Sequence, residues 1–167
     1  MKEIKNYVKP GRAASNKIYL IISIFVILSM AIINILNRYH LRKEGVYLAG
    51  EKIEILVVNN EYQKYIGLGG RNSLGEYDGM LFVYSEPGRL GVVMRDMLFP
   101  IDVVWFDNGE IVDIAPNLPI EPGVKEDDLK VYFPRAEANT FLELPAGWAM
   151  SHNLKIGDKL TIVERQY

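Results

Sequence analysis

Two acidic residues stand inside apolar segments and are the first candidates for chemistry. Asp102 lies in FPIDVVWF and Glu143 lies in FLELPAG. A carboxylate in an apolar strand is costly unless it is hydrogen-bonded or paired. If the two strands are neighbours, the pair could serve as general acid and base or bind a hard cation. The simpler alternatives are a structural anchor for Asp102 and a solvated or capping carboxylate for Glu143, so neither residue is assigned as catalytic.

Two arginines are the basic residues that could pair with Asp102, because a guanidinium binds a carboxylate through two hydrogen bonds. One of them, Arg71, lies in a glycine-rich loop, residues 67–75, whose backbone amides could hold an anion, although tight turns explain these glycines more simply. The aromatic residues of the domain, Trp105 among them, could line a sugar or peptide groove, although most are more simply core. The predicted ligand-binding residues are Arg71, Arg95, Asp102, Trp105 and Glu143.

Metal and thiol chemistry have little support in the composition. The chain has no cysteine and two histidines, which excludes disulfides, thiolate catalysis and zinc–thiolate sites. Thioethers bind Cu(I), so Met80, Met94 and Met97 are weak candidates for a copper site. Methionine is more often an irregular core filler. We therefore predict no metal centre and no cofactor.

A single apolar segment dominates the first third of the chain. Residues 18–36 (IYLIISIFVILSMAIINIL) carry no charge. As a helix they would be about 28 Å long, close to the thickness of the hydrocarbon core of a bilayer. The segment exceeds the roughly 7–15 apolar residues of a cleaved signal peptide, and no small-residue cleavage site follows it. We predict an uncleaved transmembrane signal anchor in contact with membrane lipid.

Charge around this segment predicts its orientation. Five basic residues precede it and three follow it, which favours a cytoplasmic N-terminus and an extracytoplasmic C-terminal domain. Residues 1–50 carry a net charge of +6 (eight basic, two acidic) and residues 51–167 carry −8 (eleven basic, nineteen acidic). An acidic folded part argues against binding to nucleic acid. The predicted organisation is a leader at 1–17, the anchor at 18–36, a juxtamembrane stem at 37–50 and a β-rich domain at 51–167.

The rest of the chain has the pattern of short strands separated by turns. Asp107-Asn108-Gly109 is a hairpin signal between two of them. The fold class is therefore mainly β: a small barrel or sandwich-like domain with one or two short helices after the N-terminal transmembrane helix. Strands are expected at 52–58, 80–84, 90–94, 101–106, 110–115, 139–144 and 159–163, with another near 129–133, and short helices at 61–68 and 146–154.

Several motifs in this domain resemble one family. They are GLGGR (67–71), DGMLFVY (78–84), MRDMLFPIDVVWFDNGEIV (94–112), NTFLELPAG (139–147) and IGD (156–158). In this order and spacing they resemble the family catalogued as domain of unknown function 192, over about residues 53–163. The chain departs from the family pattern at Gly69, where a methionine is usual, and at Val93, where an aromatic residue is common. The resemblance implies a compact β-rich domain, often exported or membrane-anchored, and brings no biochemical activity with it.

The leading interpretation is a non-enzymatic, membrane-anchored domain that binds a small ligand or an envelope protein. One alternative is an envelope hydrolase that uses Asp102 and Glu143 as acid and base. A second alternative is a structural module whose long loop, residues 116–134, contacts a partner.

Overall fold

The computed structural model describes residues 12–39 and 41–163. The chain divides into two units, Met1–His40 and Leu41–Tyr167. Most of the predicted leader, residues 1–11, lies outside the described residues. The first unit contains one helix and the second contains a β-rich domain, which agrees with the predicted fold class.

The first unit is helix α1, Arg12–Tyr39, which contains most of the predicted anchor. Its stretch Asn16–Ile33 is long and apolar enough to cross a membrane, and none of that stretch is buried. The two serines within it donate their hydroxyls to carbonyls of the same helix, Ser23 to Tyr19 and Ser29 to Val26, each at 2.8 Å. The helix therefore satisfies these polar groups internally, as an apolar environment requires.

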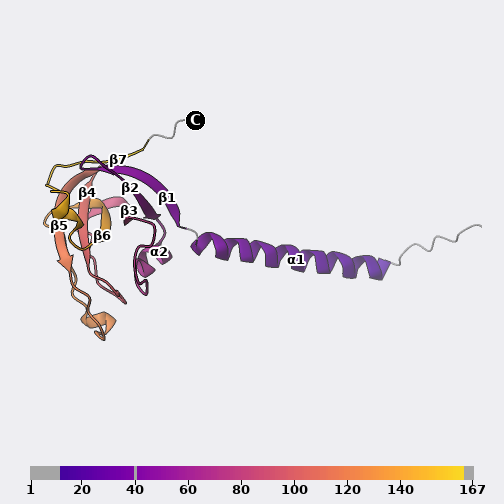
Figure 1. Cartoon of the computed structure of the whole chain (residues 1–167). Helices are drawn as coiled ribbons and strands as arrows, with labels where there is room; N and C mark the ends of the chain where they lie inside the picture. Colours follow the sequence, from indigo (N-terminus) through magenta and orange to yellow (C-terminus); the bar gives the residue numbers. More distant parts are fainter. Residues whose placement is uncertain (1–11, 40, 164–167) are drawn as a thin grey trace, which may run out of the picture. The chain divides into compact units, whose positions relative to one another are not determined.

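The second unit is built on one seven-stranded sheet (Figure 1). The strand order is β5-β4-β6-β3-β2-β1-β7, and every neighbouring pair is antiparallel except β2 with β3. Three short helical elements join the strands. The strands are β1 (Arg42–Leu48), β2 (Glu51–Val58), β3 (Gly79–Gly88), β4 (Ile101–Asp107), β5 (Glu110–Leu118), β6 (Ala138–Pro145) and β7 (Leu160–Ile162), and the helices are α2 (Glu61–Ile66), η1 (Glu126–Asp128) and α3 (Trp148–Ser151).

The sheet curls until its two ends meet. The segment before β7 bonds to the start of β5: Ile111 donates to Asp158, and Leu160 donates to Gly109, both at 2.8 Å. Side chains alternate along each strand, so each strand contributes to two cores. The enclosed face holds residues such as Val104, Phe106 and Leu142.

The outer face is covered by the long connections. Its core combines strand residues such as Trp105 and Phe141 with loop residues such as Leu68, Leu74 and Met94. The connections between β2 and β3, β3 and β4, and β5 and β6 supply this second layer. The pocket described below lies on this face.

Two segments differ from the predicted strands. Residues 42–48, which the sequence places in the juxtamembrane stem, form β1, because Val46 and Leu48 add apolar side chains to the enclosed core. The expected strands at 90–94 and 129–133 are reduced to one bridge between Val92 and Tyr132. These segments pair with each other over the outer face and do not extend the sheet.

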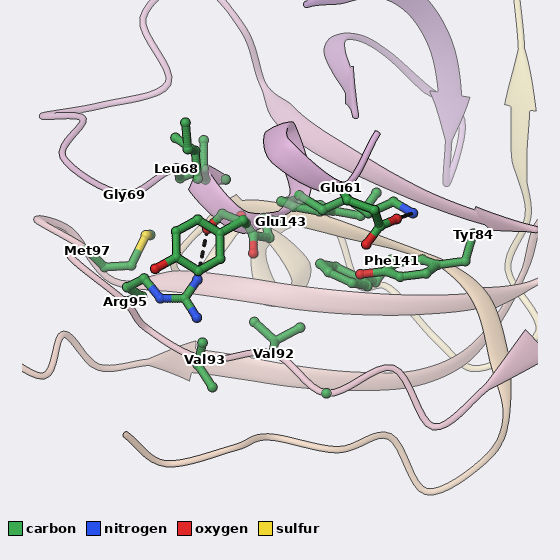
Figure 2. Close-up of a pocket in the computed structure, with 16 residues that line it drawn as sticks. Glu61, Leu68, Gly69, Tyr84, Val92, Val93, Arg95, Met97, Phe141 and Glu143 are labelled. Carbon is green, nitrogen blue, oxygen red and sulfur yellow. Dashed lines mark hydrogen bonds and ion pairs between the residues drawn. The ribbon is translucent and has the colours of Figure 1, made fainter. Parts of the chain in front are cut away.

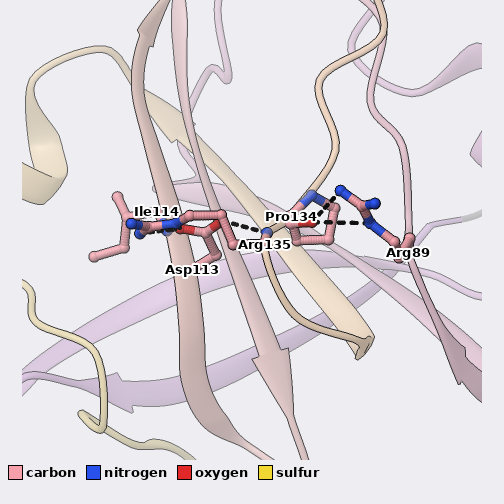
Figure 3. A network of polar contacts seen from close by, with 5 residues as sticks. All are labelled: Arg89, Asp113, Ile114, Pro134 and Arg135. Atoms are coloured by element: carbon pink, nitrogen blue, oxygen red, sulfur yellow. Dashed lines mark hydrogen bonds and ion pairs between the residues drawn. The ribbon is translucent and has the colours of Figure 1, made fainter.

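An ion pair between the buried Asp113 and the exposed Arg135 ties the connection between β5 and β6 back to the sheet (Figure 3). The Oδ1 atom of Asp113 accepts from Nε of Arg135 at 2.9 Å and from the amide of Ile114 at 2.8 Å. Its Oδ2 atom accepts from the amide of Arg135 at 2.7 Å. Burial alone would raise the pKa of this carboxyl, but these hydrogen bonds hold it below its usual value. On the other side, Arg89 donates twice to the carbonyl of Pro134.

Candidate functional site

A pocket of about 430 Å³ opens on the outer face of the sheet (Figure 2). One wall is helix α2 with the glycine-rich turn that follows it, and another is the extended segment between β3 and β4. The floor comes from strands β3 and β6. The ionisable residues of the lining are Glu61, Lys64, Tyr65, Tyr84, Arg95 and Glu143.

Glu143 lies at the floor of this pocket. It is in the middle of β6, opposite Met80 of β3 and Val103 of β4, and its side chain faces the outer core. The residue is 6% exposed, and its Oε2 atom is buried without a hydrogen-bond partner. Burial raises the pKa of Glu143 to about 8, so the neutral carboxylic acid is the predominant form at pH 7.

Arg95 reaches into the same pocket from the segment before β4 (Figure 2). Its Nη1 atom donates to the carbonyl of Tyr65 at 2.8 Å, and its Nη2 atom lies 2.6 Å from Oε1 of Glu126. The guanidinium also stacks over the ring of Tyr65, with its carbon 4.1 Å from the ring centroid. Its Nε–H is buried and has no acceptor. The arginine is therefore held in place, and its Nε–H is left without a partner.

Aromatic rings form the remaining wall. Phe82 of β3 stacks on Phe141 of β6 with centroids 4.4 Å apart, and Tyr84 extends the row. The Nζ atom of Lys64 lies 3.9 Å from the centroid of Tyr84 and 2.9 Å from Oε1 of Glu61. Burial, with smaller contributions from the charges of Glu61 and Glu143, raises the pKa of Tyr84. The pocket thus combines aromatic walls with two cations that are already paired.

The local sequence explains where α2 begins and ends, and why its end can approach the segment that carries Arg95. Asn60 caps the helix by accepting from the amide of Gln63 at 2.9 Å, and the helix ends at Gly67 with a φ of 51°. A Cβ atom at Gly69 would lie 3.0 Å from the carbonyl oxygen of Arg95. The glycine-rich segment therefore brings the end of α2 against the backbone that carries Arg95.

Asp102 lies elsewhere and has other partners. Its Oδ1 atom accepts from the amides of Asn117 and Gly147 at 2.8 and 3.0 Å, and its Oδ2 atom accepts from Ala149 at 2.8 Å. These amides, and not an arginine, satisfy the carboxylate. The arrangement is that of an anchor joining β4, the end of β5 and the start of α3.

Asp102 and Glu143 do not form a pair, although their strands are neighbours. Asp102 is opposite Leu144 on the enclosed face, whereas Glu143 is opposite Val103 on the outer face. Because side chains alternate across a strand, this one-residue offset directs the two carboxylates to opposite sides of the sheet. The acid–base pair considered from the sequence is therefore not assembled.

The other predicted residues are placed as follows. Met80, Met94 and Met97 are buried in the outer core, and the described residues contain no group of three or more His, Cys, Asp or Glu arranged to hold a metal. Trp105 is 1% exposed and donates its indole N–H to the carbonyl of Leu90 at 2.8 Å. Arg71 is half-buried and does not line the pocket.

Of the predicted set, the structure brings Arg95 and Glu143 together in one pocket. The residues of α2 that join them, Lys64 and Tyr65, were not singled out from the sequence. Their signal was present in the Asn60 cap and in the Glu61–Lys64 pair, spaced for one helical turn. Nothing in that signal indicates which strand the helix covers.

Two solved structures share this fold. A crystal structure of a protein from Sinorhizobium meliloti 1021, described as a candidate transcription regulator, is similar with a TM-score of 0.65 and 23% identity. The match covers 73% of this chain and 95% of that one. A protein of unknown function from Novosphingobium aromaticivorans DSM 12444 gives a TM-score of 0.60 at 21% identity, covering 72% of this chain and 84% of that one. At such identities the likeness concerns the fold alone.

No curated protein matches the chain. The model of the family DUF192, described as Uncharacterized ACR, matches residues 45–162. That match spans the strands, the pocket and the buried Asp102 anchor. This chain therefore belongs to the DUF192 family.

Proposed function

We propose that this protein is a membrane-anchored module of the cell envelope that binds a small ligand in the pocket above Glu143. The observation that carries the proposal is that Glu143 lines an open pocket while its buried Oε2 atom has no hydrogen-bond partner. Buried polar atoms in native proteins are nearly always hydrogen-bonded. An atom left unpaired at the floor of a pocket is satisfied when a ligand brings the missing partner.

The anchor in this proposal is helix α1, with the N-terminus in the cytoplasm and the β-domain outside. The helix is apolar on all sides, and a lipid environment covers such a surface. The excess of basic residues before the span supports the orientation. A ligand would then be met at the external face of the membrane.

Geometry favours binding over the hydrolase alternative. A hydrolase that uses Asp102 and Glu143 needs both carboxylates at one substrate bond. The cross-strand register directs them to opposite faces of the sheet, and three backbone amides occupy the Asp102 carboxylate. We therefore assign no reaction to the pocket.

Fragment screening by protein-observed NMR tests the binding proposal. The full chain is placed in lipid nanodiscs and compared with a Val93→Trp variant, whose larger side chain fills the pocket that Val93 lines. We expect fragments that shift resonances of Phe82, Phe141 and Glu143 in the wild type and do not shift them in the variant. Fragments that bind both proteins equally, or none that reach the pocket, would contradict the proposal.

Orientation is tested separately by cysteine labelling, since the natural chain has no cysteine. A Ser73→Cys variant places one thiol on an exposed loop of the β-domain. A membrane-impermeant maleimide added to intact cells should label it without permeabilisation. Labelling that requires cell lysis would reverse the proposed orientation.

A further inference from the structure

Two buried polar atoms without partners belong to residues that line the pocket. They are the Nε–H of Arg95 and the Oε2 atom of Glu143. Arginine has donors only, and a protonated carboxyl donates through its hydroxyl. A ligand that satisfies both atoms must present acceptor oxygens, which a carboxylate does with two oxygens side by side.

The aromatic faces of the pocket disfavour a cationic ligand. Those that could hold an ammonium group already carry the protein's own cations, Arg95 over Tyr65 and Lys64 over Tyr84. An incoming cation would compete for these occupied ring faces. Each of the two cations is paired with an acid, Glu126 and Glu61, so the preference for an anion rests on the two unpaired donors and not on net charge.

The apolar side chains of the pocket indicate the chemistry of the rest of the ligand. Phe82, Phe141, Val92 and Met97 are buried apolar side chains that line the pocket, and none of them offers a strong polar contact. An apolar or aromatic body gains free energy against such walls, about 25 cal/mol for each Å² removed from water.

We propose that the pocket binds a small organic monocarboxylate whose carboxylate accepts hydrogen bonds from Arg95 Nε–H and from the hydroxyl of protonated Glu143. The apolar body of the ligand packs against the aromatic row. This inference rests on the proposed function, which it narrows to one ligand class. It also makes binding depend on the proton that Glu143 carries.

The ionisable groups that line the pocket are Glu61, Lys64 and Tyr65 from α2, Tyr84 from β3, Arg95 from the segment before β4, and Glu143 from β6. Glu143 is the group whose pKa, about 8, falls between neutral and moderately alkaline pH. Above that value two carboxylates would face each other in a buried site, which opposes binding. Affinity should therefore fall as the pH rises past 8.

Three probes with one aromatic body and different head groups test the ligand class: phenylacetate, phenylacetamide and phenethylamine. Each is titrated by calorimetry into the full chain in nanodiscs at about pH 6.5 and about pH 9, and the Val93→Trp titration corrects for partition into lipid. We expect phenylacetate to bind at least about tenfold more tightly than the other two at the lower pH. Its affinity should fall about fivefold to tenfold at the higher pH, where some nine-tenths of Glu143 is ionised.

Substitutions identify the two donors. Glu143→Gln keeps a neutral group that can donate, so we expect binding of phenylacetate that no longer changes between the two pH values. Arg95→Lys keeps the charge and removes Nε–H, and should weaken phenylacetate about tenfold or more. Glu51→Gln, an exposed carboxyl away from the pocket, should keep the pH dependence of the wild type. The wild-type pH profile stands as a test even if Glu143→Gln folds poorly.

The outcomes separate this inference from the proposed function. If phenylacetamide or phenethylamine binds best and Val93→Trp abolishes that binding, the carboxylate class is wrong and the binding pocket stands. If phenylacetate binds equally at both pH values, the role of the Glu143 proton is wrong. If none of the three probes binds, the carboxylate inference falls, and the fragment screen above decides the proposed function independently.

Discussion

Glu143 couples the stability of the fold to pH. Its folded pKa of about 8 lies above the ordinary value of 4.5, because burial disfavours the charged form. The folded protein therefore holds a proton that the unfolded chain releases. The resulting stabilisation is complete below about pH 4.5 and is lost as the pH rises through 8.

Replacing Glu143 with glutamine should flatten this dependence. Between pH 5 and 8 the group lowers the free energy of unfolding of the wild type by up to about 1.4 kcal/mol per pH unit. The measurement is urea titration of the full chain in nonionic detergent, followed by tryptophan fluorescence. The free energy of unfolding of Glu143→Gln should increase relative to that of the wild type as the pH rises. Glu51→Gln should follow the wild type. Parallel profiles for Glu143→Gln and the wild type would mean that the carboxyl is ionised in the folded protein.

Asp102 is the opposite kind of buried acid, because its charge is satisfied by backbone amides. At present the carboxylate accepts hydrogen bonds from three backbone N–H groups. In Asp102→Asn the NH₂ group of the new side chain would face at least one of these N–H groups, so that two donors would meet without an acceptor. We expect a loss of about 2–4 kcal/mol in the free energy of unfolding. Probe binding in the pocket should remain, because Asp102 lies on the enclosed face. Asp127→Asn, an exposed change on η1, should alter stability by less than about 0.5 kcal/mol.

The elements around the pocket meet through close backbone contacts. Strand β3 begins at Gly79, where it enters the sheet between β2 and β6. A Cβ atom at Gly79 would lie 2.9 Å from the carbonyl oxygen of Glu143 and 2.9 Å from the side chain of Leu142. The start of β3 can approach the strand that carries Glu143 because this residue has no side chain.

Two glycines of the same strand give a matched test of this contact. Gly79→Ala should cost about 1–3 kcal/mol, because the neighbouring carbonyl is backbone and cannot move aside. Gly88→Ala should be neutral or slightly stabilising, because nothing lies within 4 Å of the added atom. Thermal unfolding of both variants checks the difference. Equal stabilities would show that β3 can shift without loss.

At the scale of the whole molecule, the apolar helix determines the cellular location in our proposal. The double substitution Ile24→Arg and Ile27→Arg would place two charges near the middle of the span. Each charge costs about 2.5–3.5 kcal/mol of insertion free energy. Alkaline carbonate extraction should release this double variant from the membrane fraction and leave the wild type there. Leucines at the same positions should have no effect. A wild-type protein fully released by carbonate would refute the anchor.

Much of the architecture follows from the pattern of residues along the chain. The apolar run at 18–36 predicts the helix, since its composition is uniform over a length that matches a bilayer. Alternation and the Asp107-Asn108-Gly109 turn predict β4 and β5, because both signals are local. The motifs spread over residues 67–158 predict the family, which the match over residues 45–162 confirms.

The assembly of the site depended on contacts between residues far apart in the sequence. Strand order and register decide that Glu143 faces the pocket while Asp102 faces the enclosed core, and a shift of one residue would reverse this. The same long-range packing brings α2 and Arg95 over Glu143, and it makes residues 42–48 a strand. The helix, the β-rich class and the family can be predicted from the chain alone, because local composition and the order of motifs are enough to indicate them. The polar groups that are buried without partners become known only in the folded protein, because burial depends on what the rest of the chain packs against.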